Sequence, residues 1–138
     1  MNNRVLYAIL ILIFGSGACT ASKTANLEES VNDFFTAMRR EDKNAALSFV
    51  GPEKRTEFFK NSEQLEAIHF SNIRVDTIYP DETQEKALVT VVMEYFSPKS
   101  MNLTSAKRFF NWEYDSKNKV WYVIEAHPLG SGPQLKSK

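Results

Sequence analysis

The hydrophobic pattern of this chain changes its period near residue 70, and this change constrains the fold more than any other feature. From Leu27 to Met38, apolar residues recur every three or four positions, which predicts an amphipathic helix. Beyond residue 70, apolar residues alternate with polar ones or form β-branched and aromatic runs, which predict strands. Helices followed by strands are typical of an α+β domain, because each helix must bury its apolar face against another layer.

More helical structure is expected between residues 42 and 68. Asp42 suits the N-cap of a short second helix, which Gly51 and Pro52 would end. Pro52 also suits the first position of a third helix. A further turn capped by Ser62 would follow. The expected inner residues of these last two segments are Phe58, Phe59, Leu65 and Ile68.

Four strands are predicted, at residues 72–79, 87–96, 106–114 and 120–124. Polar turns at residues 80–83 and 115–118 separate neighbouring strands and indicate an antiparallel arrangement. We therefore expect one α+β domain at residues 27–127, with N-terminal helices packed on one face of a curved antiparallel four-stranded sheet. Residues 128–138, rich in Pro and Gly, are predicted to form a flexible tail.

The N-terminus has the pattern of an export signal. Arg4 precedes an apolar run from Val5 to Phe14, which is shorter than the about 20 residues that span a bilayer. Small residues follow, and then Cys19, the only cysteine of the chain. This pattern predicts a signal peptide at residues 1–18 that is removed after Ala18.

The segment Gly17-Ala18-Cys19 resembles the lipobox of bacterial lipoproteins. The resemblance implies that Cys19 carries lipid, that residues 19–26 form a lipidated flexible tether, and that the partner of the anchor is a membrane. Thr20 implies delivery to the outer membrane, facing the periplasm. Ser16 departs from the leucine that the family favours, and residues 16–18 also suit ordinary signal peptidase. A soluble secreted or periplasmic form, or an uncut leader, stays open as an alternative.

The order of the elements carries a second resemblance. Trp112-Glu113-Tyr114, a polar turn and then residues 121–124 near the end resemble the nuclear transport factor 2-like superfold, also called cystatin-like, over residues 27–126. The superfold hosts enzymes, transport factors and binding modules, so it does not settle function. By the same analogy, homodimerisation through the sheet is one option.

Composition excludes some classes of function. With 17 basic and 17 acidic residues, the chain lacks the basic surplus typical of nucleic-acid binding. His69, expected at the end of a helical turn, and His127 are the only histidines. Together with Cys19 they cannot supply a zinc set, so neither a metal nor another cofactor is expected.

No catalytic residue is assigned from the sequence. Enzymes of the superfold place an acid inside an apolar cone, where desolvation raises its pKa. Strand alternation instead predicts that the candidate acids face solvent. These acids are Asp76, Glu94, Glu113 and Glu125.

Aromatic residues gather on three predicted strands. They indicate a binding surface that includes Tyr95, Phe110, Trp112 and Tyr114, or, on the opposing interpretation, an ordinary core. The leading hypothesis is an envelope lipoprotein whose domain binds an envelope protein or a small apolar ligand without catalysis. The alternatives are a cone-type isomerase-like or dehydratase-like enzyme, which needs a buried acid, and a structural accessory protein of the envelope.

Overall fold

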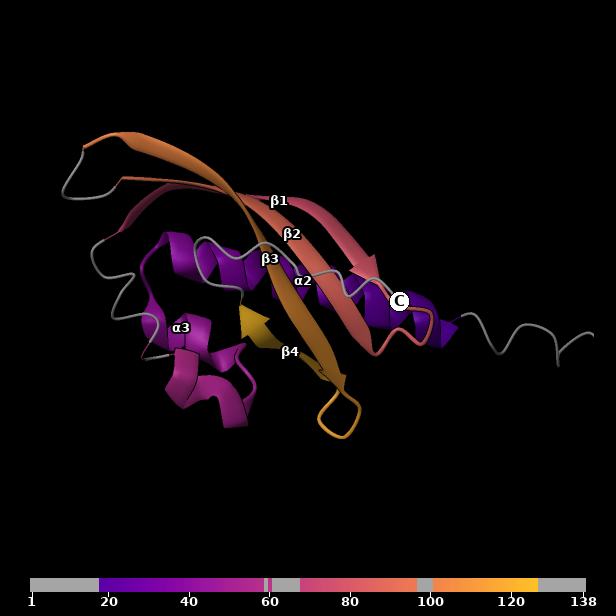
Figure 1. The fold of residues 1–138 in the computed structure, drawn as a ribbon. Helices are drawn as coiled ribbons and strands as arrows, with labels where there is room; N and C mark the ends of the chain where they lie inside the picture. Colours follow the sequence, from indigo (N-terminus) through magenta and orange to yellow (C-terminus); the bar gives the residue numbers. More distant parts are fainter. Residues whose placement is uncertain (1–17, 59, 61–67, 97–100, 127–138) are drawn as a thin grey trace, which may run out of the picture.

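The computed structural model describes residues 18–58, 60, 68–96 and 101–126, and it confirms the α+β arrangement (Figure 1). Helices come first and an antiparallel sheet follows. The elements are α2 (Ala18–Arg39), α3 (Lys43–Ser48), η2 (Pro52–Lys54), β1 (His69–Pro80), β2 (Lys86–Phe96), β3 (Leu103–Asp115) and β4 (Val120–Ala126).

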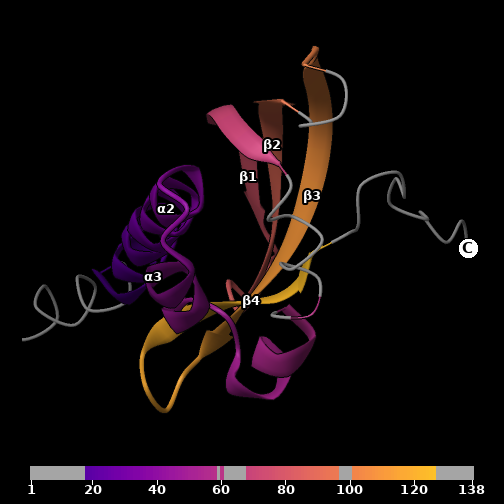
Figure 2. The same ribbon diagram turned by 90° about the vertical axis from the view of Figure 1, so that its left-hand side faces the viewer.

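The four strands lie side by side in the order β1-β2-β3-β4. β2 and β3 pair without interruption from Lys86 opposite Glu113 to Phe96 opposite Leu103. The β1–β2 pair contains two register shifts and the β3–β4 pair contains one. Such bulges bend strands and increase their twist, which fits the curvature of the sheet in Figure 1. The helices cover one face, here called the inner face (Figure 2); the opposite face is the outer face.

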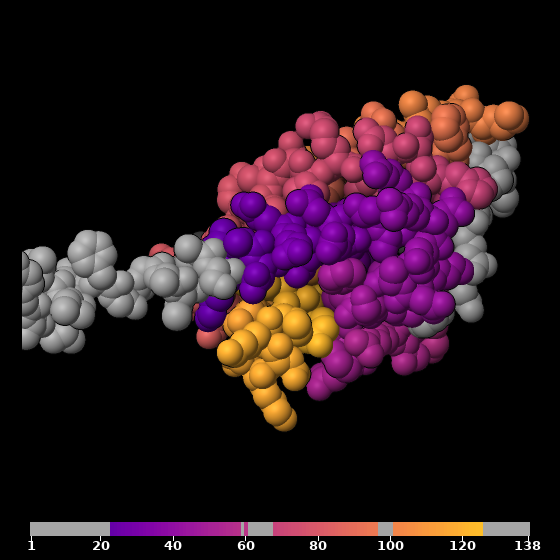
Figure 3. Space-filling model, turned by 180° about the vertical axis from the view of Figure 1, so that it is seen from behind, coloured from indigo at the N-terminus to yellow at the C-terminus, as the bar shows by residue number. Residues whose placement is uncertain are grey.

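Helix α2 forms the central contact with the sheet, because its apolar stripe is buried as predicted. Leu27, Val31 and Phe34 are fully buried. The Phe34 ring is surrounded by five other rings at centroid distances of 4.9–6.3 Å. Figure 3 shows β1 on one side of α2. On the other side of α2 lie β4 and the segment that contains α3. Each such side chain contributes about 2 kcal/mol when it is buried, so this contact dominates the core.

Helix α2 also begins earlier than the sequence predicts. It starts at Ala18, so residues 19–26, predicted to be a flexible tether, are helical. The backbone carbonyl of Lys23 accepts a hydrogen bond from Trp121 Nε1 at 3.1 Å. Lys23 Nζ lies 4.8 Å from the centre of the Tyr114 ring. These contacts from the sheet hold a segment whose own small, polar residues give no helical periodicity.

The segment after α2 confirms the predicted cap and adds a strand-like contact. Asp42 accepts a hydrogen bond from the backbone N–H of Ala45 at 3.0 Å and caps α3. α3 ends at Ser48 instead of continuing through Val50. Val50 forms a parallel bridge with Val123 of β4, because Val123 N–H donates to the Phe49 carbonyl at 2.8 Å. The backbone N–H of Gly51, in turn, donates to the Val123 carbonyl at 3.0 Å.

The predicted third helix is a single 3-10 turn at Pro52–Lys54 followed by helical backbone through residue 58. Phe58 packs on Phe34 as an inner residue, with ring centroids 6.1 Å apart. The side chain of Phe59, and the turn predicted at Ser62 and Leu65, lie outside the described residues. Among the residues described, no helix combines the length and apolar character needed to cross a membrane.

Candidate functional site

The inner face of the sheet differs at its two ends, and this difference defines the candidate site. At the covered end, α2 and β4 bury Val89, Phe110 and Trp112 almost completely. Toward the other end, Phe70, Tyr95, Ala106 and Arg108 are only partly buried and Thr104 is exposed, although Met93 between them stays buried. We call this second region the open end, and it comprises Phe70, Tyr95, Thr104, Ala106 and Arg108. In Figure 2, β1, β2 and β3 rise past α2 at this end.

The predicted binding surface does not exist as one exposed surface. Phe110 and Trp112 are 4% and 0% exposed, because they pack against Phe34 of α2. Their prediction as surface residues is therefore wrong, and the core interpretation holds for both. Tyr95 and Tyr114 are half-buried and lie at opposite ends of the sheet. Only Tyr95 belongs to the open end.

Tyr95 packs beside Phe70 of β1, and their ring centroids lie 6.4 Å apart in a T-shaped arrangement. Tyr114 instead packs against Trp121 in a tilted arrangement, with ring centroids 5.3 Å apart, and the ammonium group of Lys23 lies over its ring. Edge-to-face and tilted contacts of this kind stabilise aromatic pairs modestly beyond the area they bury. The open end therefore presents a partly exposed aromatic pair, whereas the pair at the covered end is part of the attachment of α2.

The four candidate acids lie on the outer face, as strand alternation predicts. Asp76 lies at a bulge and its Oδ2 contacts Lys107 Nζ at 2.8 Å. The hydrogen bond and the charge of Lys107 lower the pKa of Asp76. Glu125 accepts a hydrogen bond from the Asn111 side chain at 2.9 Å. The described strands thus place none of these carboxylates on the helix-covered face, where an acid of a cone-type site would lie.

His69 is not at the end of a helical turn, as predicted, but is the first residue of β1. Its Nδ1 lies 2.8 Å from Glu41 Oε1, just beyond the end of α2. Both side chains are more than half exposed. This contact connects the end of α2 to the start of the sheet. His127 lies outside the described residues.

The sequence analysis missed Arg108, the only cation among the described inner-face strand residues. It lies opposite Val91, a fully buried residue of β2. Its Nη1 donates to the backbone carbonyl of Lys107 at 2.9 Å. Its Nε is buried and has no hydrogen-bond partner within the described part of the chain. Arg108 lies two residues before Phe110 and four before Trp112, so strand alternation places all three side chains on the same face. This alternation could have identified Arg108 from the sequence.

An unpartnered buried donor costs free energy, typically about 1–3 kcal/mol, so it requires an explanation. A guanidinium on an apolar face suits the recognition of a carboxylate or phosphate, because its planar N–H groups match these anions. The open end therefore combines an anion-binding group with aromatic and aliphatic contacts. Elsewhere, the described residues contain no group of three His, Cys, Asp or Glu side chains placed to hold a metal ion.

No protein-family profile matches the sequence, and no curated protein matches it. Several solved structures are similar in fold. One is a ketosteroid isomerase-like protein from Erwinia carotovora atroseptica, with a TM-score of 0.55 and 15% identity, covering 72% of this chain and 89% of the other. Another is a protein named as a polyketide cyclase from Xanthomonas campestris pv. campestris, with a TM-score of 0.55 and 9% identity, covering 75% and 92%.

A SEC-C motif containing protein from Rhodopseudomonas palustris is similar to the same extent, with a TM-score of 0.55 and 16% identity, covering 69% of this chain and 72% of the other. At these identities, the similarity concerns the fold alone. The domain has the nuclear transport factor 2-like fold, with helices packed on a four-stranded antiparallel sheet, as its element order predicts.

Proposed function

We propose that this chain is an envelope lipoprotein whose nuclear transport factor 2-like domain binds a small ligand without catalysis. The ligand has an apolar body and one anionic group, and it binds at the open end of the inner face. The observation that carries the proposal is the buried Nε of Arg108, which has no hydrogen-bond partner among the described residues and lies on a mostly apolar face.

The chemistry of the open end supports this ligand class. Phe70 and Tyr95 offer partly exposed rings for an apolar body. Arg108 offers donors for a carboxylate or phosphate. The pairing of β3 with β2 fixes the backbone of Arg108, and the hydrogen bond from its Nη1 to the Lys107 carbonyl orients the guanidinium. A preorganised donor loses little entropy when a ligand binds.

A cone-type small-molecule enzyme is the second candidate, and the isomerase-like and cyclase neighbours favour it. Such an enzyme requires a desolvated acid or base beside its substrate. The outer-face positions of Asp76, Glu94, Glu113 and Glu125 argue against it. Turnover of a ketosteroid substrate by the purified protein would establish the enzyme and defeat the non-catalytic proposal. A structural envelope accessory, working as a homodimer or with another envelope protein, is a third option from the sequence.

The envelope part of the proposal rests on the apolar run from Val5 to Phe14 and on Cys19. Mass spectrometry of the mature N-terminus tests it, with Cys19→Ser as the control. We expect a chain that begins at a triacylated Cys19 and is recovered with the outer membrane, and a variant without lipid. A full-length cytosolic chain that begins at Met1 would defeat this part of the proposal.

Ligand binding is tested by titrating the protein with octanoate and, as the uncharged comparison, octanol. We expect octanoate to bind at least tenfold more tightly than octanol, because only octanoate can pair with Arg108. The Arg108→Met variant should remove this preference, whereas Arg74→Met, which changes a cation of the outer face, should keep it. Equal binding of octanoate by the wild type and Arg108→Met would contradict the proposed site.

A further inference from the structure

β3 has an open edge over about half of its length. β3 runs from Leu103 to Asp115, but its pairing with β4 covers only Phe110 to Asp115. Residues 103–109 pair with β2 on one side, and no described strand pairs with them on the other side. This open stretch, here called the β3 edge, lies beside the open end of the sheet.

The direction of the backbone groups follows from one hydrogen bond. Tyr114 N–H donates to the Glu85 carbonyl at 2.8 Å, so the even-numbered residues of β3 direct their backbone groups toward β2. Because the direction alternates, the odd-numbered residues direct theirs toward the β3 edge. Of the backbone groups that point to the β3 edge, only the Lys107 carbonyl has a hydrogen-bond partner in the described part of the chain. It accepts a hydrogen bond from Arg108 Nη1. The odd-numbered residues of the edge are Leu103, Ser105, Lys107 and Phe109.

The edge of β1 on the other side of the sheet is different. Its register shifts after Phe70 and after Val75, and the strand ends at Pro80. Bulges and proline are features by which proteins prevent other strands from pairing with an edge. The β3 edge has neither, because the β2–β3 register is continuous from residue 103 to residue 113. Of these two edges, the β3 edge is therefore the one better suited to accept another strand.

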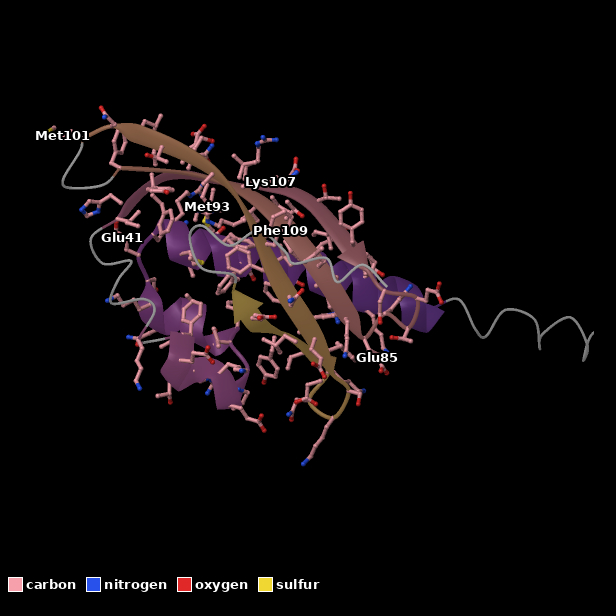
Figure 4. The ribbon with its side chains drawn as sticks, viewed as in Figure 1. Glu41, Glu85, Met93, Met101, Lys107 and Phe109 are labelled. Carbon is pink, nitrogen blue, oxygen red and sulfur yellow. The ribbon has the colours of Figure 1, made fainter. Side chains whose placement is uncertain are left out.

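Charge and apolar exposure indicate what this strand would contain. Residues 103–109 include Lys107 and Arg108 and no acid. At the start of the edge, Leu103 and Met101 are 54% and 86% exposed. Figure 4 shows Met101 at the tip of the β2–β3 hairpin, with Lys107 farther along β3. We propose that the β3 edge binds an extended, acidic segment of a partner protein, which adds as a fifth strand and places an apolar residue near Leu103.

Added strands of this kind gain affinity from main-chain hydrogen bonds and specificity from alternate side chains. A carboxylate on the outer side of the added strand would lie near Lys107 and would share its ammonium group with Asp76. The chain's own residues after Ala126 suit the edge less well, because they contain Lys136 and Lys138 and no acid. The β3 edge acts through the backbone groups of its odd-numbered residues, whereas the ligand site depends on the side chain of Arg108, so the two proposals can fail independently.

Amide hydrogen exchange measured by NMR tests the proposal, with the synthetic peptide acetyl-Val-Glu-Val-Glu-Val-Glu-Val-amide as the probe. We expect exchange at Ser105, Lys107 and Phe109 to slow at least tenfold when the peptide is added. Exchange at Thr104 and Ala106 should be slow from the start, because these residues pair with β2. Absence of peptide binding, or binding without protection of the odd-numbered residues, would overturn the proposal. So would protection of these residues before the peptide is added, which would indicate that the chain or a second copy already covers the edge.

Two further comparisons separate backbone pairing from charge. A peptide with Lys in place of Glu should bind at least tenfold more weakly, and equal binding of the two peptides would overturn the acidic requirement. Ser105→Pro removes an N–H that points to the β3 edge and should abolish binding, whereas Ser105→Ala keeps that N–H and should bind normally. Loss of binding by both variants would contradict backbone pairing. If Ser105→Pro does not fold, the exchange pattern of the wild type decides.

Discussion

The β2–β3 hairpin is core at one end and surface at the other, although the same two strands pair continuously along it. Ala87 and Trp112 face each other in the covered end and are 5% and 0% exposed. At the open end, the inner-face residues Tyr95 and Thr104 are also directly opposed, but Tyr95 is only partly buried and Thr104 is exposed. The comparison shows that burial is set by where α2 and β4 end, because the strands themselves do not change.

The largest effect is expected from Phe34→Ala, at the centre of the covered end. Removing a fully buried ring with five aromatic neighbours should lower the free energy of unfolding by about 3–5 kcal/mol. Urea unfolding followed by tryptophan fluorescence measures this change. A loss below about 1 kcal/mol would mean that the α2 contact is not the centre of the core.

A smaller effect is expected from Trp121→Phe, which removes the indole N–H that donates to the Lys23 carbonyl. The variant keeps an aromatic ring but loses a hydrogen bond and some packing, so we expect a loss of about 1–2 kcal/mol. Hydrogen exchange of the amides in the first turns of α2 should become faster at the same time. Unchanged exchange in that segment would show that Trp121 does not hold it.

Low pH should destabilise the covered end, because the carboxylates of Asp81 and Asp115 in its two turns become protonated. Burial raises the pKa of Asp81, but hydrogen bonds from Lys86, Thr83, Glu85 and Gln84 outweigh it and lower that pKa below 3.8. The side chain and backbone of Asn118 lower the pKa of Asp115 in the same direction. Because each folded-state pKa lies below the unfolded one, this stabilisation is complete at neutral pH and is lost as the pH falls below about 3.8.

The double variant Asp81→Asn, Asp115→Asn should therefore show a flatter dependence of stability on pH in the acid range below about pH 3.8 than the wild type. Urea midpoints measured across this range provide the test. If the two curves run parallel, the carboxylates of these turns do not couple protonation to folding.

The smallest effect on stability is expected at the hairpin tip. Met101→Ser should change the free energy of unfolding by no more than about 0.5 kcal/mol, because the side chain is 86% exposed. The thermal midpoint of the variant should match that of the wild type within about 3 °C. A larger loss would mean that the tip is covered in solution, and the contrast between the two ends would not hold.

The sequence predicted well those elements whose own residues carry the signal. The apolar stripe from Leu27 to Met38, the Asp42 cap and the four strands follow from periodicity and capping chemistry. β3 begins at Leu103 instead of at residue 106, because its first residues pair with β2 without forming an apolar pattern. The helical start of α2 at Ala18 could not be predicted, since it depends on contacts with Trp121 and Tyr114 from the far end of the chain.

The candidate site was less accessible to sequence reasoning. Alternation correctly separated the candidate acids from the inner face, but it could not tell where along a strand the helix cover ends. Phe110 and Trp112 therefore looked like surface candidates, and Arg108, two residues earlier on the same face, was overlooked. Whether an inner-face residue is core or site depends on the relative lengths of packed elements, and that is a tertiary property.

The attachment of α2 also fixes how the domain would be oriented on a surface. The helix begins beside Trp121 and Tyr114 at the covered end and finishes near His69, where β1 starts. With 22 residues it is about 33 Å long. A lipid on Cys19 would place the bilayer next to the covered end. The Phe70–Tyr95 pair and the β3 edge would then face away from the bilayer, within reach of molecules in the surrounding compartment.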